Sequence, residues 1–325
     1  IKDRGAILSI GHAANGAYWF SGKTEGNFVS STFYMDALPK WASDFNASRS
    51  IDSYLTTWDT YYPMETYVET GPDNTAYERI APGSETPTFP YDLAAGAKYA
   101  GYDILKATPV GNSLTTDFAL AALQGESLGT DNDADILMIS YSSTDYVGHV
   151  FGVNAKELQD TYVRLDMDLA RLFSALDKQV GKGKYTVFLT SDHGVAHVPR
   201  YLMDNNIPAG YFQKKDFEAE LKTHIAAYFG SDELIRNVSN NEVYLHHKKI
   251  ASERLNLNDI KAAIVSFSTS FQGIAAVYDT NELMKMNKSS AIIERLQRGF
   301  HPKRSGDIVF ILEPGFMDNG KYGQK

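Results

Sequence analysis

The sequence predicts an α/β fold with a mostly parallel central sheet flanked by helices. An uninterrupted apolar run at 136–139 is typical of a strand that is buried on both faces of such a sheet. An amphipathic segment follows at 154–179, and a second apolar run occupies 185–189. Two strands joined by a helix in this order run parallel and form a right-handed crossover unit.

The helix predicted at 154–179 has apolar side chains at steps of three and four residues, as one buried helix face requires. These side chains are Leu158, Tyr162, Leu165, Leu169, Leu172 and Leu176. Asn154 is a residue type that caps helix starts, and Gly181 and Gly183 end the pattern. The polar segment 140–149, before this helix, is expected to be a loop.

The flanking parts of the chain differ in character. Residues 1–120 are rich in Tyr, Gly, Thr and Pro, and we expect loops with short strands there. The second half predicts helices at 216–228, 257–268 and 288–298 and strands at 242–246, 273–279 and 306–312. We interpret 206–300 as an accessory α+β insertion within one domain that covers 1–325.

Composition excludes several classes of partner. Lys and Arg total 31 against 40 Asp and Glu, and the net charge of −9 disfavours nucleic acid. The chain has no cysteine, so any metal must be bound by His, Asp or Glu. Its longest apolar runs are shorter than the ~20 residues of a membrane span, so we expect no membrane partner.

Both predicted strands are followed by a segment that contains an Asp and a His. These segments are TDYVGH at 144–149 and SDHG at 191–194. Ligands bind open α/β sheets at the carboxyl ends of strands, where these segments lie. One Asp at a strand end usually caps a helix or forms a turn, but two such pairs favour a metal. Oxygen and nitrogen ligands without thiolate suit zinc or a similar divalent ion. We therefore predict four metal ligands, which are Asp145, His149, Asp192 and His193.

The other histidines do not complete this set. We expect surface or packing roles for His12, His246, His247 and His301. His197 lies just beyond the second motif, and its alternatives are core packing, a backbone hydrogen bond, or support of a metal ligand.

Two further pairs of residues are candidates for a role in the chemistry. The hydroxyls of Thr144 and Ser191 adjoin the ligands, and we interpret them as holding the loops rather than as nucleophiles. Lys2 and Arg4 would point the same way in an extended segment and could clamp phosphate oxygens. A Lys-x-Arg pair by itself is usually a solvated surface.

The two Asp/His motifs together resemble the metal-binding signature of the alkaline phosphatase superfamily, which includes nucleotide pyrophosphatase/phosphodiesterases. KDRGAI at 2–7 and GHAANGAYWF at 11–20 resemble its PafA-type bacterial zinc alkaline phosphatases in particular. The resemblance implies an alkaline-phosphatase-like sandwich. It also implies that Asp145 and His149 bind one zinc and that Asp192 and His193 bind the other. Lys2 and Arg4 would contact the phosphoryl oxygens.

The same resemblance implies zinc-dependent hydrolysis of small-molecule phosphate monoesters through a covalent phosphoenzyme, with two Zn²⁺ per complete catalytic domain. The Thr nucleophile, one Asp ligand and the last His ligand are expected outside this sequence. We therefore expect a partial catalytic domain over 1–325, truncated at both ends and inactive in isolation. A periplasmic or secreted monomer is also implied.

Two alternatives remain open at this point. A phosphodiesterase or nucleotide pyrophosphatase of the same superfamily would share both metal motifs but replace the cationic pair. A non-catalytic fragment would bind metal and phosphate without turnover. No GxGxxG or Walker pattern follows a strand, which argues against a dinucleotide or ATP site.

Overall fold

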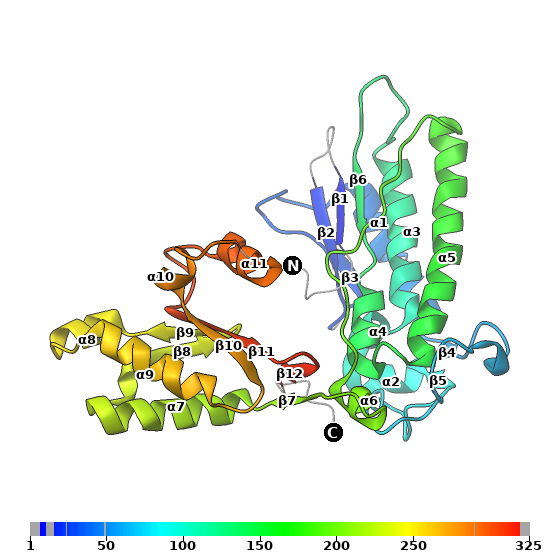
Figure 1. Ribbon diagram of the computed structural model, residues 1–325. Coiled ribbons are helices and arrows are strands. Elements are labelled where there is room, and N and C mark those ends of the chain that lie inside the picture. The colour runs from blue at the N-terminus through cyan, green and yellow to red at the C-terminus, as the bar shows by residue number, and fades with distance from the viewer. Residues whose placement is uncertain (1–6, 11–15, 24, 49, 289, 319–325) are drawn as a thin grey trace. The chain divides into compact units, whose positions relative to one another are not determined.

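The computed structural model describes residues 7–10, 16–23, 25–48, 50–288 and 290–318 (Figure 1). The chain folds into two compact units, one that ends at His197 and one that begins at Val198. Each unit has a hydrophobic core of its own.

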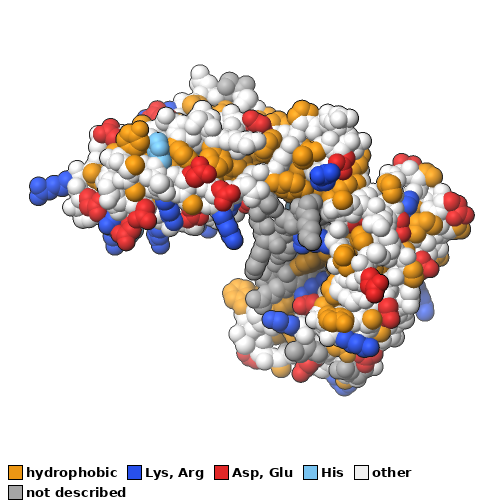
Figure 2. All heavy atoms as spheres, turned by 90° about the horizontal axis from the view of Figure 1, so that it is seen from below, with side chains coloured by type: hydrophobic (Ala, Val, Ile, Leu, Met, Phe, Trp, Pro, Cys, Tyr) orange, Lys and Arg blue, Asp and Glu red, His pale blue; other side chains and the backbone are white. Residues whose placement is uncertain are grey.

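The exposed side chains carry both signs of charge. On the face drawn in Figure 2, Lys and Arg side chains lie interspersed with Asp and Glu. Within the described part of the chain, no helix is both long and apolar enough to span a bilayer.

The first unit contains a four-stranded sheet with the strand order β3-β2-β1-β6. Its strands are β1 (Ile7–Ile10), β2 (Gly16–Ser21), β3 (Asn27–Val29) and β6 (Leu137–Ser140). All three pairings between them are antiparallel. A short ladder joins β4 (Thr57–Trp58) to β5 (Tyr91–Asp92).

Helix α3 (Pro109–Gly125) packs against the sheet and against the other long helices of this unit. Pro109 stands at its first position, where the fixed φ of proline suits a helix start. The other helices are α1 (Lys40–Ala47), α2 (Leu93–Ala100), α4 (Ser143–Phe151) and α5 (Lys156–Leu176). Shorter 3₁₀ turns lie at Ser50–Tyr54, Met64–Thr66 and Gly101–Ala107, and a π turn at Asp177–Gly181 extends α5.

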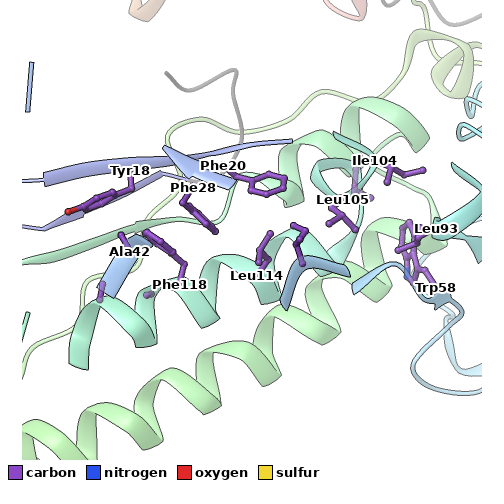
Figure 3. Packing of buried hydrophobic residues seen from close by; sticks show 14 of the residues in the cluster. Tyr18, Phe20, Phe28, Ala42, Trp58, Leu93, Ile104, Leu105, Leu114 and Phe118 are labelled. Atoms are coloured by element: carbon purple, nitrogen blue, oxygen red, sulfur yellow. The ribbon is translucent and has the colours of Figure 1, made fainter. Parts of the chain in front are cut away.

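Aromatic side chains form the core between α3 and the sheet (Figure 3). The ring of Phe118 stacks on that of Phe28 with centroids 3.8 Å apart, and it meets Tyr18 edge to face at 5.5 Å. All three side chains are almost completely buried. Aromatic pairs in these geometries add to the stabilisation that burial provides.

Two predictions for this unit are correct, and two are wrong. The strand at 136–139 is β6, and the helix at 154–179 is α5. The expected polar loop 140–149 is largely helix α4. The expected strand 185–189 forms no ladder with any described residue, and the side chain of Phe188 is 90% exposed. Two parallel strands are therefore not formed there, because an apolar run predicts burial but does not supply a neighbouring strand.

The second unit contains a four-stranded antiparallel sheet with the order β10-β11-β9-β8. Its strands are β8 (Ile235–Ser239), β9 (Glu242–Leu245), β10 (Ile274–Asp279) and β11 (Ile308–Leu312). The helices are α6 (Pro199–Asp204), α7 (Lys214–Phe229), α8 (His247–Ser252), α9 (Leu257–Thr269), α10 (Thr280–Leu283) and α11 (Ala291–Gly299). Every helix and strand predicted after residue 205 is present within a few residues of its expected bounds.

A two-stranded parallel ladder joins the two ends of the second unit. It pairs β7 (Gly210–Phe212) with β12 (Phe316–Asp318). The accessory insertion at 206–300 stays a prediction. Strand β11 lies beyond that range and pairs with β9 and β10, so it belongs to the sheet of this unit.

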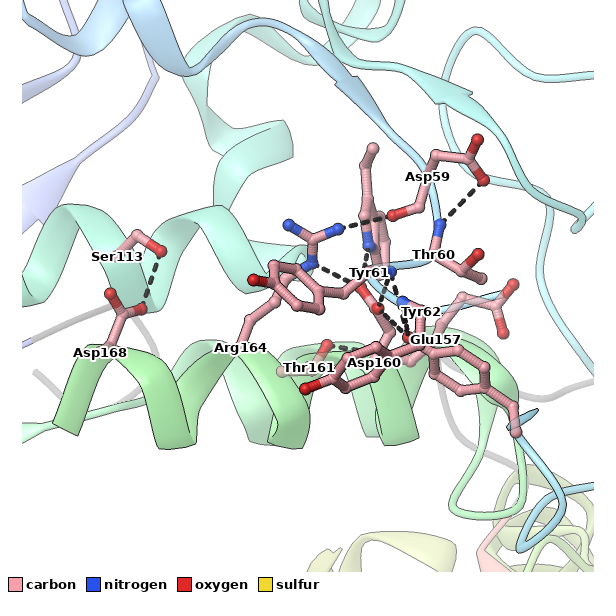
Figure 4. A network of polar contacts seen from close by, with 12 residues as sticks. Asp59, Thr60, Tyr61, Tyr62, Ser113, Glu157, Asp160, Thr161, Arg164 and Asp168 are labelled. Atoms are coloured by element: carbon pink, nitrogen blue, oxygen red, sulfur yellow. Dashed lines mark hydrogen bonds and ion pairs between the residues drawn. The ribbon is translucent and has the colours of Figure 1, made fainter. Parts of the chain in front are cut away.

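Helix α5 holds the long segment 57–91 through buried carboxylates (Figure 4). Asp160 is completely buried and accepts four hydrogen bonds. One turn earlier, Glu157 is also completely buried, and its Oε1 accepts a bond of 2.5 Å from the Tyr91 hydroxyl. The burial of these two acids is set by the loop that covers them.

Glu157 belongs to a group of three acids that interact electrostatically with one another. Burial raises the pKa of Glu157 to about 8 and that of Glu78 to about 7, and it also raises the pKa of Asp73. Each of these carboxyl groups has one buried oxygen that accepts no hydrogen bond from any residue the structure describes. The charge of Lys156 offsets part of the rise in the pKa of Asp73. The Tyr91 hydroxyl donates a hydrogen bond to Glu157.

We expect the substitution Glu157→Gln to stabilise the protein at alkaline pH. The folded state holds the Glu157 proton to about pH 8, whereas the unfolded chain releases it near 4.5. Stability from this group is therefore complete below pH 4.5 and is lost as the pH rises to about 8. Glutamine keeps the acceptor for Tyr91 and does not titrate. At pH 9 the free energy of unfolding of the variant should be roughly 4 kcal/mol higher than that of the wild type. At pH 5 the two values should differ little.

Denaturant unfolding at a series of pH values measures this difference. Asp166 is exposed on the same helix, so Asp166→Asn is the matched control for replacing a carboxyl group of α5 with an amide. Parallel pH profiles for the wild type and Glu157→Gln would contradict the expectation.

Candidate metal centre

Helix α4 carries the first pair of predicted ligands. Asp145 lies in its first turn and His149 in its last, four residues apart on one face of the helix. Asp145 Oδ2 and His149 Nε2 are 3.5 Å apart. The helix that replaces the expected loop therefore sets the separation of these two side chains.

The second pair follows the extended segment 185–190. Asp192 Oδ2 and His193 Nε2 are 3.7 Å apart, and the same His193 nitrogen lies 4.0 Å from Asp145 Oδ1. The structure thus brings all four predicted ligands into one group with Asp145 at its centre. Ligands from different motifs are at least 43 residues apart in the sequence. Their side chains are between 38% and 64% exposed, so solvent and small ligands reach them.

The backbone contact of His193 determines which nitrogen of the neutral ring carries the hydrogen. His193 Nδ1 lies 2.8 Å from the carbonyl oxygen of Gly194, which can only accept, so Nδ1 carries the hydrogen. In the neutral ring the lone pair is then on Nε2, and it faces the carboxylates of Asp145 and Asp192. A lone pair beside two carboxylates is an arrangement that a cation stabilises.

The donor set fits zinc in its chemistry. Two ligand atoms of a tetrahedral zinc, each about 2.0–2.1 Å from the metal, are roughly 3.3 Å apart. The separations of 3.5 and 3.7 Å within the two pairs are close to this value. Among the residues that the structure describes, however, no three His, Asp or Glu side chains are already arranged around one point as ligands.

The remaining predicted residues either contact other groups or lie outside the described residues. Lys2, Arg4 and His12 lie outside the described residues. His197 Nδ1 is 2.8 Å from Asn154 Oδ1, so Asn154 bonds to this ring instead of capping α5. Three histidines of the second unit contact local groups: His246 accepts from Lys249 N, His247 pairs with Asp307, and His301 accepts from Lys303 N.

One contact beside the centre was not predicted from the sequence. Thr144 Oγ1 accepts a hydrogen bond of 3.0 Å from Asn112 Nδ2 on α3, and Asn112 is completely buried. Gly111 and Asn112 interrupt a helix whose other buried positions are mostly apolar, and both are poor helix formers. That interruption is the signal in the sequence that could have identified this contact.

The chain is similar to known phosphoester hydrolases. A family model described as type I phosphodiesterase / nucleotide pyrophosphatase matches residues 4–325. The chain is 39% identical to alkaline phosphatase PafA of Elizabethkingia meningoseptica, over 98% of this chain and 58% of PafA. It is 42% identical to a protein named calcium-transporting ATPase from Myroides odoratus, over 100% of this chain and 60% of that protein.

The structure is similar to the crystal structure of wild-type PafA, with a TM-score of 0.89 and 37% identity. The match covers 95% of this chain and 59% of the PafA chain. The predicted α/β, alkaline-phosphatase-like fold class and the predicted PafA-type resemblance are therefore confirmed. The chain spans about 60% of the length of these relatives.

Proposed function

Because the chain belongs to the type I phosphodiesterase / nucleotide pyrophosphatase family, we propose that it forms the metal-binding part of a zinc-dependent phosphate monoester hydrolase. The observation that carries this proposal is the convergence of Asp145, His149, Asp192 and His193 from two separate motifs. The PafA relative is named an alkaline phosphatase, which supports the reaction class.

In this proposal Asp145 and His149 hold one zinc, and Asp192 and His193 hold the other. The short separations within each pair support this division, and the contact between His193 and Asp145 supports two metals side by side. Zinc supplies a Lewis acid that lowers the pKa of an attacking hydroxyl and stabilises charge on the leaving oxygen. The Gly194 carbonyl keeps the hydrogen of His193 on Nδ1 and so leaves Nε2 available as a ligand.

Lys2 and Arg4 are assigned to the non-bridging phosphoryl oxygens. A monoester carries one more charged oxygen than a diester, so two cations at that position favour monoesters. We further propose a covalent phosphoenzyme, a monomer, and a periplasmic or secreted location, which the PafA resemblance supports.

The second candidate is a phosphodiesterase, which the description of the matching family favours. Both candidates use the same metal ligands and differ in whether the substrate needs the two cations. The ratio of monoester to diester turnover therefore distinguishes them.

The test uses the full gene product, its zinc content and its hydrolysis of p-nitrophenyl phosphate and bis-p-nitrophenyl phosphate. We expect two zinc ions per chain. A double variant with Lys2→Ala and Arg4→Ala should lose monoester turnover by about 100-fold or more. Its fold loss of diester turnover should be smaller than this by a factor of roughly ten or more. Lys182 and Lys184 are an exposed pair with the same spacing, so replacing both with alanine is the matched control.

Equal losses on the two substrates, or a preference for the diester in the wild type, would favour the phosphodiesterase. A protein that binds no zinc would refute both candidates.

A further inference from the structure

The start of α4 decides where the Asp145 carboxylate lies. Asp145 is in the first turn of this helix, so its side chain follows any movement of residues 141–144. Helix α4 lies beside α3 (Figure 1). Three contacts with α3 hold the segment that precedes the ligand.

The first contact holds the residue that leads out of β6. Thr116 Oγ1 on α3 lies 3.1 Å from the hydroxyl of Tyr141. The second contact is steric. Gly111 lies against Ser143, and a Cβ on Gly111 would be 2.1 Å from Ser143 Oγ and 2.6 Å from the Leu105 carbonyl oxygen. A side chain at position 111 would therefore meet both Ser143 of α4 and the backbone of the 3₁₀ turn Gly101–Ala107.

The third contact is the hydrogen bond from Asn112 Nδ2 to Thr144 Oγ1, at 3.0 Å. Thr144 is the residue immediately before Asp145. Asn112 is completely buried, and its Oδ1 has no hydrogen-bond partner among the described residues. A buried amide with an unpaired oxygen costs stability, so packing alone does not account for an asparagine at this position.

We propose that Asn112 is a positioning residue for the metal centre, which acts through Thr144 to fix the first turn of α4 and the Asp145 carboxylate. This inference rests on the proposed function, because it gives Asp145 a metal to bind. Asn112 itself touches neither metal nor substrate. Its effect should therefore appear in metal affinity before it appears in chemistry.

The experiment measures Zn²⁺ affinity of the full gene product by competition with a chromophoric chelator, alongside kcat and KM at saturating zinc. Asn112→Ala and Thr144→Val each remove one partner of the bond and should weaken zinc binding by about 10- to 100-fold. Saturating zinc should restore most of kcat and leave KM unchanged. Thr144→Ser keeps the acceptor oxygen and should bind zinc within about three-fold of the wild type.

The matched control is Thr115→Val. Thr115 is also buried on α3, and its hydroxyl bonds to the Gly111 carbonyl oxygen within the same helix. This variant should lower the melting temperature about as much as Thr144→Val but leave zinc affinity unchanged. If Asn112→Ala fails to fold, Thr144→Val tests the same hydrogen bond.

Two results would overturn the inference. In the first, the wild type binds zinc, and folded Asn112→Ala or Thr144→Val binds it with unchanged affinity. The bond between Asn112 and Thr144 would then have only a structural role, and the proposed function would stand. A wild type that binds no zinc would overturn the proposed function and this inference together.

Discussion

Replacement of Asp145 with alanine is expected to lower phosphate monoester hydrolysis by roughly a thousand-fold and to release bound zinc. Of the four clustered side chains, Asp145 is the one with oxygens near both His149 and His193. A metal ion contributes several kcal/mol to stabilisation of the transition state, and each 1.4 kcal/mol corresponds to about a factor of ten in rate. Loss of this carboxylate therefore affects both proposed metals.

The measurement pairs elemental analysis with kcat/KM on the full gene product. Asp133→Ala removes an exposed carboxylate from a loop of the same unit and is the control. The melting temperature of Asp145→Ala should stay close to that of the wild type in the absence of metal, because the side chain is 38% exposed. Full activity with normal zinc content in Asp145→Ala would remove this residue from the metal centre.

Replacement of Asp160 with alanine should lower the free energy of unfolding by about 3–5 kcal/mol. The carboxylate accepts bonds from Trp58 Nε1 (2.8 Å), the Tyr61 amide (2.7 Å), the Tyr67 hydroxyl (2.6 Å) and Arg164 Nε (2.7 Å). Alanine leaves buried donors and a guanidinium without their acceptor. Asparagine keeps one acceptor oxygen without the charge, so Asp160→Asn should lie between alanine and the wild type.

Denaturant unfolding gives the energy, and the ionisation of tyrosine gives an independent readout. Burial, together with the bond to Asp160, raises the pKa of Tyr67 to about 12. Absorbance titration of Asp160→Ala should show an additional tyrosine that ionises closer to pH 10. Asp59 is exposed on the same loop, and Asp59→Ala should change stability by less than about 0.5 kcal/mol. A loss of under about 1 kcal/mol in Asp160→Ala would show that the loop does not depend on this carboxylate.

The sequence predicts those elements whose pattern is local. Helix α5 and the elements of the second unit have regular periodicity, which depends only on neighbouring residues. The four clustered residues were also predictable, because each motif has a specific composition. Their roles as ligands stay predictions.

The features that could not be predicted depend on long-range contacts. In α5, Glu157 and Asp160 occupy positions that a helical wheel assigns to solvent, yet the segment 57–91 folds over them and both are fully buried. The apolar run 185–189 fails for the opposite reason. Its hydrophobicity is real, but no described strand pairs with it, and Phe188 and Leu189 are 90% and 77% exposed. Periodicity reports what a segment can bury and does not report which segment covers it.

The parallel pairing of β7 with β12 has a consequence for the modularity of the chain. The chain enters this ladder at Gly210 and returns to it at Phe316, and a Cβ on Gly315 would be 3.1 Å from that of Ala209. The segment 210–315 therefore begins and ends at neighbouring positions. Joining Ala209 directly to Phe316 would remove the segment 210–315 without a linker. A different domain whose termini are adjacent could be inserted there at little cost in loop-closure entropy.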